Sequence, residues 1–207
     1  MRQDGMRLLI TAALVQALTV LAAAGAVASH YDSLYPTDNS DWLCSDGSVG
    51  DVNFCLSDNS TLTNCKESSL TTSDKNAINS TINGSYDNTD LSVSHHASCT
   101  YSGGSETDIV YQKGSGVPSG NVVWTWCNDA VSFRTCDQHY VRYIPSFSVN
   151  RALACHETGH SIGLTHGQGA SPRVANDSES LECMKRPTPS ADYFLGTHNI
   201  NQINLYY

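Results

Sequence analysis

Apolar and polar residues alternate along the middle of the chain, a pattern that predicts short β-strands. The four clearest segments are LSVSHHASCTY (91–101), ETDIVYQK (106–113), NVVWTWC (121–127) and CDQHYVRYI (136–144). Gly-rich or polar turns separate them, such as GSGVPSG between the second and the third. The earlier region 29–65 has only short apolar pieces, such as 49–56, among many Asp, Asn, Ser and Thr residues. We expect strands and turns there rather than a helix.

Two further segments space their apolar residues by three or four positions, as amphipathic helices do. The first, 72–84, has Ser73 as its expected N-cap and Gly84 in place to end it. The second, 197–207, has Thr197 as its expected N-cap. The apolar positions are Ala77, Ile78 and Ile82 in the first helix and Ile200, Ile203 and Tyr207 in the second.

A third helix is predicted over SFSVNRALACHETGHSIG, residues 146–163. Ser146 or Ser148 is its expected N-cap, and Leu153 is among the apolar residues that would pack. Gly163 is placed to end the helix. A polar loop of roughly twenty residues follows, and loops of that length are usually functional or held by other constraints.

The N-terminal residues have the three-part pattern of a secretory signal peptide. Two arginines come first, an apolar run from 8 to about 24 follows, and AVA at 26–28 matches an A-x-A cleavage site. No stop-transfer pattern, internal repeat or long linker comes later. We therefore expect residues 1–28 to be removed and 29–207 to be secreted as a single domain without a membrane anchor.

The charge of the chain limits its partners. It has 207 residues, with 11 Lys and Arg against 20 Asp and Glu, which gives a net charge of −9. No run of basic residues forms a patch, and this argues against nucleic acid or an anionic membrane as a partner. We expect a monomer without either partner.

All eight cysteines lie after the predicted signal peptide. An even number in an exported chain predicts four disulfides, and the lack of a C-x-x-C motif argues against a cysteine-ligated zinc or a redox site. The sequence alone leaves many pairings open. Our expectation joins near neighbours: Cys44 with Cys55, Cys65 with Cys99, Cys127 with Cys136, and Cys155 with Cys183.

The motif HETGHSIGLTH holds three of the chain's eight histidines. His156 and His160 are four residues apart, which places them about 40° apart on one helix face, where two imidazoles can reach one zinc ion. Glu157 lies at the flank of that face and could contact a water held by the metal. His166 can share the ion only if the chain turns sharply, and Gly163 is the residue type that permits this turn.

The spacing H-E-x-x-H-x-x-G-x-x-H resembles the signature of the metzincin clan of zinc metallopeptidases. HETGHSIGLTH and the C-terminal NINQINLYY are most similar to its matrixin-like branch. The clan's signature continues with a Met-turn, for which LECMKRP supplies Met184. The resemblance implies that Met184 lies beneath the metal as an apolar floor. It also implies that Cys155 and Cys183 meet there, so that a disulfide between them would clamp the long loop.

The resemblance covers 146–207 well, and 29–145 only in the order of its elements. It implies an α+β fold with a twisted, mostly parallel sheet, an antiparallel edge strand, an active-site helix and a C-terminal helix, stapled by disulfides. The upper subdomain would span about 29–163 and the lower about 164–207. An edge strand would pair with an extended peptide or protein substrate. Segment 136–144 is near the right place, although a buried strand would have the same pattern.

The chemistry that these residues imply is peptide-bond hydrolysis. Three neutral imidazoles with one open position for water are typical of a catalytic rather than a structural zinc site. Zinc lowers the pKa of that water from about 16 to about 7, so Glu157 could act as general base and pass the proton to the leaving amine. The alternatives are a catalytically silent binding module on the same scaffold and a purely structural disulfide-rich domain. An intact Glu157 argues against the first, and the histidine spacing against the second.

The chain departs from the family pattern at three points. Gly167 stands where a matrixin-like Ser would follow His166. Lys185 and Arg186 follow the methionine without a tyrosine, so the tyrosine switch ligand of some clan members is missing. No cysteine lies between 29 and 41, so the cysteine switch of a prosegment is missing as well.

Other features have weaker signals. DGSVGDVN (46–53) hints at calcium but lacks the EF-hand spacing, so a plain turn is the simpler interpretation. Trp124 and Trp126 could line a substrate site or pack on one face of the sheet. Four further histidines could bind an accessory metal or be simply exposed or hydrogen-bonded: His95, His96, His139 and His198. Four N-x-S/T sequons could carry glycans, and they start at Asn59, Asn79, Asn83 and Asn176.

Overall fold

The computed structural model describes most of the chain after the predicted signal peptide. The described residues are 31–48, 55–188 and 194–207. The signal-peptide prediction for 1–28 and most of the calcium-like segment 46–53 lie outside them. Residues Tyr31–Tyr207 pack as one unit. Within the described ranges, no helix has the length and apolar composition that crossing a membrane requires.

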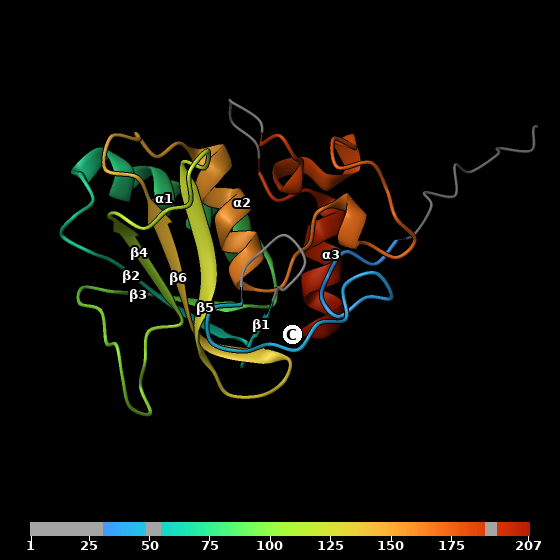
Figure 1. The fold of residues 1–207 in the computed structure, drawn as a ribbon, viewed down its shortest axis with the longest axis horizontal. Coiled ribbons are helices and arrows are strands. Elements are labelled where there is room, and N and C mark those ends of the chain that lie inside the picture. The colour runs from blue at the N-terminus through green and yellow to red at the C-terminus, as the bar shows by residue number, and fades with distance from the viewer. Residues whose placement is uncertain (1–30, 49–54, 189–193) are drawn as a thin grey trace, which may run out of the picture. The chain divides into compact units, whose positions relative to one another are not determined.

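The four alternating segments and two strands that precede them form a six-stranded sheet (Figure 1). Its strands are β1 (Leu56–Ser57), β2 (Thr61–Lys66), β3 (Ser92–His96), β4 (Ile109–Lys113), β5 (Val123–Ala130) and β6 (Thr135–Tyr143). The parallel strands have the order β1-β6-β4-β2-β3, and β5 pairs with β6 in the antiparallel direction. All four strands expected between 91 and 144 are confirmed, as is a mostly parallel sheet in an α+β fold.

Of the two interpretations of segment 136–144, a strand inside the sheet is confirmed and an edge strand is not. Segment 136–144, which contains most of β6, lies inside the sheet and pairs with β1, β4 and β5. The antiparallel edge strand is β5, which among the described residues pairs only with β6. The alternating pattern cannot separate the two cases, because it reports which face of a strand is buried and not which strands flank it.

Three α-helices accompany the sheet: α1 (Thr72–Ser85), α2 (Arg151–Ser161) and α3 (Thr197–Tyr206). α1 packs against α2, and α2 packs against β5 and β6. Figure 1 shows α2 beside β5, with the later chain, in orange to red, on its other side. There the 3₁₀ segment η3 (Glu179–Met184) contacts both α2 and α3. α2 therefore has the sheet on one side and the C-terminal segments on the other.

The first helix begins at Thr72, as expected, but its N-cap lies two residues before the expected one. Thr71 caps α1 through a capping box, in which its side chain accepts from Asp74 N and the Asp74 carboxylate accepts from Thr71 N. Ser73 therefore lies inside the helix. Several hydroxyl residues in a row could serve as cap, and the acidic residue three positions on selects Thr71. The helix continues to Ser85, one residue past Gly84.

The N-caps of the other two helices also differ from the expected residues. Asn150, not Ser146 or Ser148, caps α2 through its side-chain oxygen. α3 begins at Thr197, so its N-cap position is Gly196, which makes no side-chain capping bond. Apolar spacing locates a helix face well, but it does not mark the residue at which the helix starts.

The apolar faces of α1 and α3 meet a common core, as their spacing predicts. Ile78, Ile82 and Ile203 are fully buried, and Ala77 and Ile200 are partly buried against the same cluster. These contacts hold both helices to the body of the fold by removing apolar surface from water.

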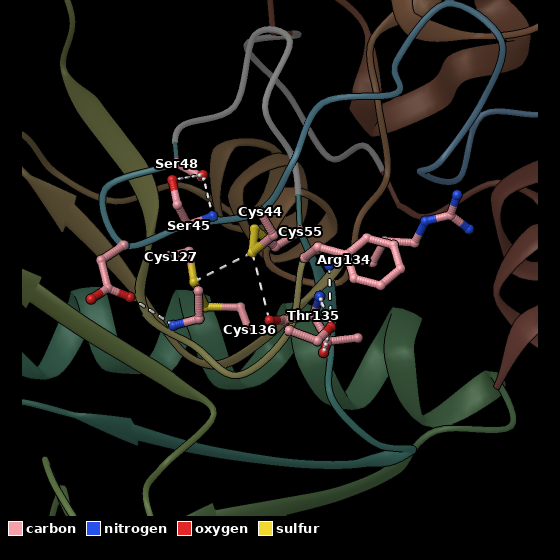
Figure 2. Close-up of a disulfide and its surroundings, with 12 residues drawn as sticks. Cys44, Ser45, Ser48, Cys55, Cys127, Arg134, Thr135 and Cys136 are labelled. Carbon is pink, nitrogen blue, oxygen red and sulfur yellow. Dashed lines mark hydrogen bonds between the residues drawn. A yellow bond between two sulfur atoms is a disulfide. The ribbon is translucent and has the colours of Figure 1, made fainter.

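Four disulfides staple the fold, and they join the expected near neighbours. They are Cys44–Cys55, Cys65–Cys99, Cys127–Cys136 and Cys155–Cys183. Figure 2 shows two of them side by side, with Cys44 Sγ 3.8 Å from Cys127 Sγ. Cys44 N also donates to Phe133 O at 2.8 Å. The N-terminal segment is thus fastened to the β5–β6 hairpin.

Candidate metal centre

α2 carries the first two histidines of the motif and ends shortly before the third. His156 and His160 lie one turn apart in the helix. Gly163, with a φ of +94°, then redirects the chain in a conformation that glycine adopts without steric cost. A Cβ at Gly163 would also lie 2.9 Å from Leu56 Cδ2. This turn is the one that the spacing requires for His166 to approach the other two histidines.

The three imidazoles converge through their Nε2 atoms. Nε2 of His160 lies 3.0 Å from Nε2 of His156 and 3.1 Å from Nε2 of His166. The third separation, between His166 and His156, is 3.0 Å. All three residues are buried, with exposed fractions of 4–6%. The structure therefore brings together the three histidines that the motif singled out.

Backbone carbonyl groups orient two of the rings. His156 Nδ1 lies 2.7 Å from Cys183 O, and His160 Nδ1 lies 2.8 Å from Leu164 O. Because a carbonyl oxygen only accepts, each Nδ1 carries a proton, and in the neutral ring the lone pair is on Nε2. Lone pairs this close to one another repel unless a cation lies among them. The cluster thus has the donor set and the ring support of a metal site.

The electrostatics of the cluster also favour the neutral imidazole. Burial lowers the pKa of His160 well below its usual value, and the neighbouring His156 and His166 lower it further. The neutral imidazole is the form that binds a metal ion. Three such nitrogens could hold one divalent ion of the kind that imidazole suits, such as zinc, copper, iron or nickel.

Glu157 places a carboxylate beside the histidines. Thr125 of β5 donates from Oγ1 to Oε2 of Glu157, and both residues are buried. Sequence reasoning missed Thr125. Its position in the alternating pattern puts it on the buried face of β5 with Val123. The pattern does not tell which helix residue this face meets, because that depends on how α2 packs.

Met184 packs directly against the helical turn that bears the histidines. A Cβ at Gly159 would lie 2.4 Å from Met184 Sδ and 3.1 Å from Met184 Cε. Met184 itself is fully buried. Sequence reasoning singled out Met184 but missed Gly159, the residue inside the motif whose lack of a side chain makes room for it.

The Cys155–Cys183 disulfide joins α2 to the η3 segment beside the histidines. Its Cα atoms are 5.9 Å apart. Cys183 is thus bonded to α2 through its sulfur and orients His156 through its carbonyl oxygen. On the other side, the Tyr86 hydroxyl donates to Cys155 O at 2.7 Å. One cysteine pair therefore links the helix, the η3 segment and the ring of His156.

A cleft of about 220 Å³ lies over the histidines. Its lining consists of residues 120–125, Leu153, the motif residues His156, Glu157, His160 and His166, and then Arg186 and Thr188. Of the two tryptophans, Trp124 lines the cleft. Trp126 instead meets Tyr140 edge to face, with ring centroids 5.2 Å apart. Among the described lining residues, Arg186 is the only lysine or arginine.

The other histidines do not gather into a second cluster within the described residues. His95 Nδ1 lies 2.9 Å from Lys66 Nζ in a surface network. His139 is buried, and burial lowers its pKa to about 3. His198 packs on the ring of Tyr31, with centroids 3.9 Å apart. The contacts of His95 and His198 favour the simpler interpretation for these two residues. His139 does not fit it, because it is buried and its two ring nitrogens have no hydrogen-bond partner among the described residues.

An acidic cluster that sequence reasoning missed lies near Asp137. Its members come from distant segments: Asp58, Asp108 and Asp137 form one group, and Glu106 and Asp129 join Asp137 in another. Burial raises the pKa of Asp108 to about 6. Hydrogen bonds from Thr63 oppose this shift, and the nearby carboxylates add to it. Because its members are far apart in the sequence, no local spacing indicates the cluster.

Comparison with known proteins adds no relative: no family model matches the chain, and no curated protein matches it. The functional interpretation therefore depends on the motif and on the geometry around it.

Proposed function

We propose that the chain is a secreted zinc-dependent endopeptidase. The observation that carries the proposal is the convergence of three histidine Nε2 atoms within 3.1 Å of one another, beside the buried carboxylate of Glu157 in a cleft. The resemblance of the motif to the metzincin signature supports the same function. Four disulfides are typical of proteins from oxidising compartments, which supports secretion.

His156, His160 and His166 would hold the ion. A site with three protein ligands is typical of catalytic zinc, whereas structural zinc is usually enclosed by four. When bound, zinc lowers the pKa of a water and polarises the scissile carbonyl group. Met184 would provide the apolar floor that the resemblance implies, because it packs against Gly159 between the two helical histidines.

Glu157 is the residue that would move the proton. Its carboxylate takes a proton from the attacking water and then delivers it to the amine of the leaving peptide, so one group serves both halves of the reaction. The hydroxyl of Thr125 holds Oε2 of Glu157 and thereby fixes the direction in which the other oxygen can act. Both residues are buried, so the carboxylate keeps one position.

β5 would bind the substrate. Among the described residues, β5 pairs only with β6, and residues 123–125 at its start line the cleft. An extended peptide could add to this edge through main-chain hydrogen bonds. The expected substrate is therefore a peptide or protein segment in an extended conformation.

Metal removal and replacement test this proposal. Residues 29–207 are purified and offered a diverse peptide library before dialysis against a chelator, after it, and after one equivalent of zinc is returned. We expect cleavage within the peptides that is lost on chelation and restored by zinc. The variant His160→Gln should lose the cleavage. The matched control is His95→Gln, a change at a histidine outside the cleft, which should keep it. Cleavage that persists without metal, or that survives His160→Gln, would contradict the proposal.

A further inference from the structure

Arg186 gives the cleft a positive charge, and no other described lining residue is a lysine or an arginine. It is exposed and lines the cleft together with Thr188, the three motif histidines and Glu157. Apart from Glu157 and the histidines, the other lining residues are uncharged, among them Val123 and Leu153.

The neighbouring lysine does not share this position. Lys185 is 8% exposed, and its Nζ lies 2.9 Å from Oε2 of Glu179. The backbone of Arg186 is anchored as well, since Arg186 N donates to Asn176 O at 2.7 Å. Two successive cationic residues thus have different surroundings, and only Arg186 lines the cleft.

This local charge is opposite to that of the molecule as a whole. The chain has a net charge of −9, so its overall field repels acidic peptides. A guanidinium in the cleft reverses the preference at short range, because its planar donor groups match a carboxylate and make charge-assisted hydrogen bonds. A site of this kind selects by the charge of the substrate next to the reacting bond.

We propose that Arg186 is a specificity-determining residue that binds a substrate carboxylate close to the scissile bond. This inference depends on the proposed peptidase function and names its substrate class: peptides that present a carboxylate beside the cleaved bond. The carboxylate could belong to an Asp or Glu side chain or to the C-terminus of a short substrate. Both present the same chemistry to the guanidinium.

The test uses eight versions of one cleaved peptide. The residue beside the scissile bond is Glu or Gln, tried on either side of the bond, and the C-terminus is a free acid or an amide. For the wild type, we expect kcat/KM to be about 10-fold higher for the version with the preferred carboxylate, as charge-assisted hydrogen bonds at an exposed site allow. Arg186→Gln should bring this ratio close to one, and Arg186→Glu should invert it. A high salt concentration should reduce it in the wild type.

The ratio compares two substrates on one preparation, so partial misfolding of a variant does not affect it. Arg134→Gln is the matched control, because Arg134 is an exposed arginine that does not line this cleft. It should keep the wild-type ratio. A higher kcat/KM for the Glu version, or instead for the free-acid version, supports the proposal and identifies which carboxylate Arg186 binds. A wild-type ratio near one, or a ratio unchanged in Arg186→Gln, overturns it. If no version is cleaved, the peptidase proposal fails instead.

Discussion

Thr125 of β5 donates a hydrogen bond to Glu157 of α2, so the strand that borders the cleft holds the carboxylate inside it. The two residues are far apart in the sequence and both are buried. An unpartnered buried carboxylate would be costly, and it would also turn freely between orientations. The bond therefore couples the edge strand β5, the proposed substrate-binding strand, to the group that would move the proton.

The first prediction concerns this bond. Thr125→Val keeps the shape of the side chain but removes the donor. We expect kcat to fall by about 10- to 100-fold, as is typical when a partner that orients a metal-site or catalytic group is lost. Thr125→Ser should recover most of the rate, because it restores the hydroxyl. Equal losses in Thr125→Val and Thr125→Ser would show that packing, not the hydrogen bond, matters here.

A second prediction compares two helical glycines. At Gly159 a Cβ would lie 2.4 Å from Met184 Sδ, so we expect Gly159→Ala to destabilise the protein by about 1–3 kcal/mol and to weaken metal binding. At Gly84 of α1 the nearest atom would be Phe194 Cε1 at an ordinary 3.6 Å. Gly84→Ala should therefore be neutral or stabilising by up to about 1 kcal/mol. Chemical denaturation of both variants in chelator measures the difference, and similar effects in the two would refute the packing argument.

The last residue of the chain supplies a third prediction. The Tyr207 hydroxyl accepts from Ser57 N at 3.0 Å and donates to Ile162 O at 3.0 Å, next to the turn that redirects the chain toward His166. Tyr207→Phe leaves two backbone groups without this partner, so it should cost roughly 1–3 kcal/mol. Tyr206→Phe is the matched control, since Tyr206 is 51% exposed and should change stability by less than about 0.5 kcal/mol. Thermal denaturation would separate them by roughly 2–4 °C per kcal/mol.

The acidic cluster predicts a dependence of stability on pH. Burial raises the pKa of Asp108 from 3.8 in the unfolded chain to about 6 in the fold, so ionisation of this carboxyl disfavours folding. The cost is absent below pH 3.8, grows as the pH rises to about 6, and is constant above that value. Asp108→Asn should therefore raise the Tm relative to the wild type at pH 7–8. This advantage should shrink as the pH falls toward 4. A Tm difference that does not change with pH would contradict the account.

Local features of the site could be predicted from the sequence, because a helix fixes the geometry of residues one turn apart. His156 and His160 follow from helical periodicity, and His166 joins them because Gly163 permits the turn. The features that depend on packing between distant segments could not be predicted. Thr125 meets Glu157 only because β5 lies beside α2.

The edge strand illustrates the same limit on the scale of the fold. The alternation over 121–127 and 136–144 correctly predicts two strands. Which of them has a free edge depends on the sheet order, and the sheet order depends on contacts made by β1 and β4. Likewise, the caps of α1 and α2 are set by side chains next to several similar candidates, so the spacing predicts the helices but not their N-cap residues.

The most direct test of the central claim is the turnover of one cleaved peptide by zinc-loaded wild-type protein and by Glu157→Gln with the same metal content. Gln keeps an oxygen that can accept from Thr125 but cannot take a proton. We expect both proteins to bind one zinc per chain and the variant to lose about 10²–10⁴-fold in kcat, the typical contribution of a general base. Equal turnover by the two proteins at equal zinc content would contradict the role of Glu157 and, with it, the proposed mechanism.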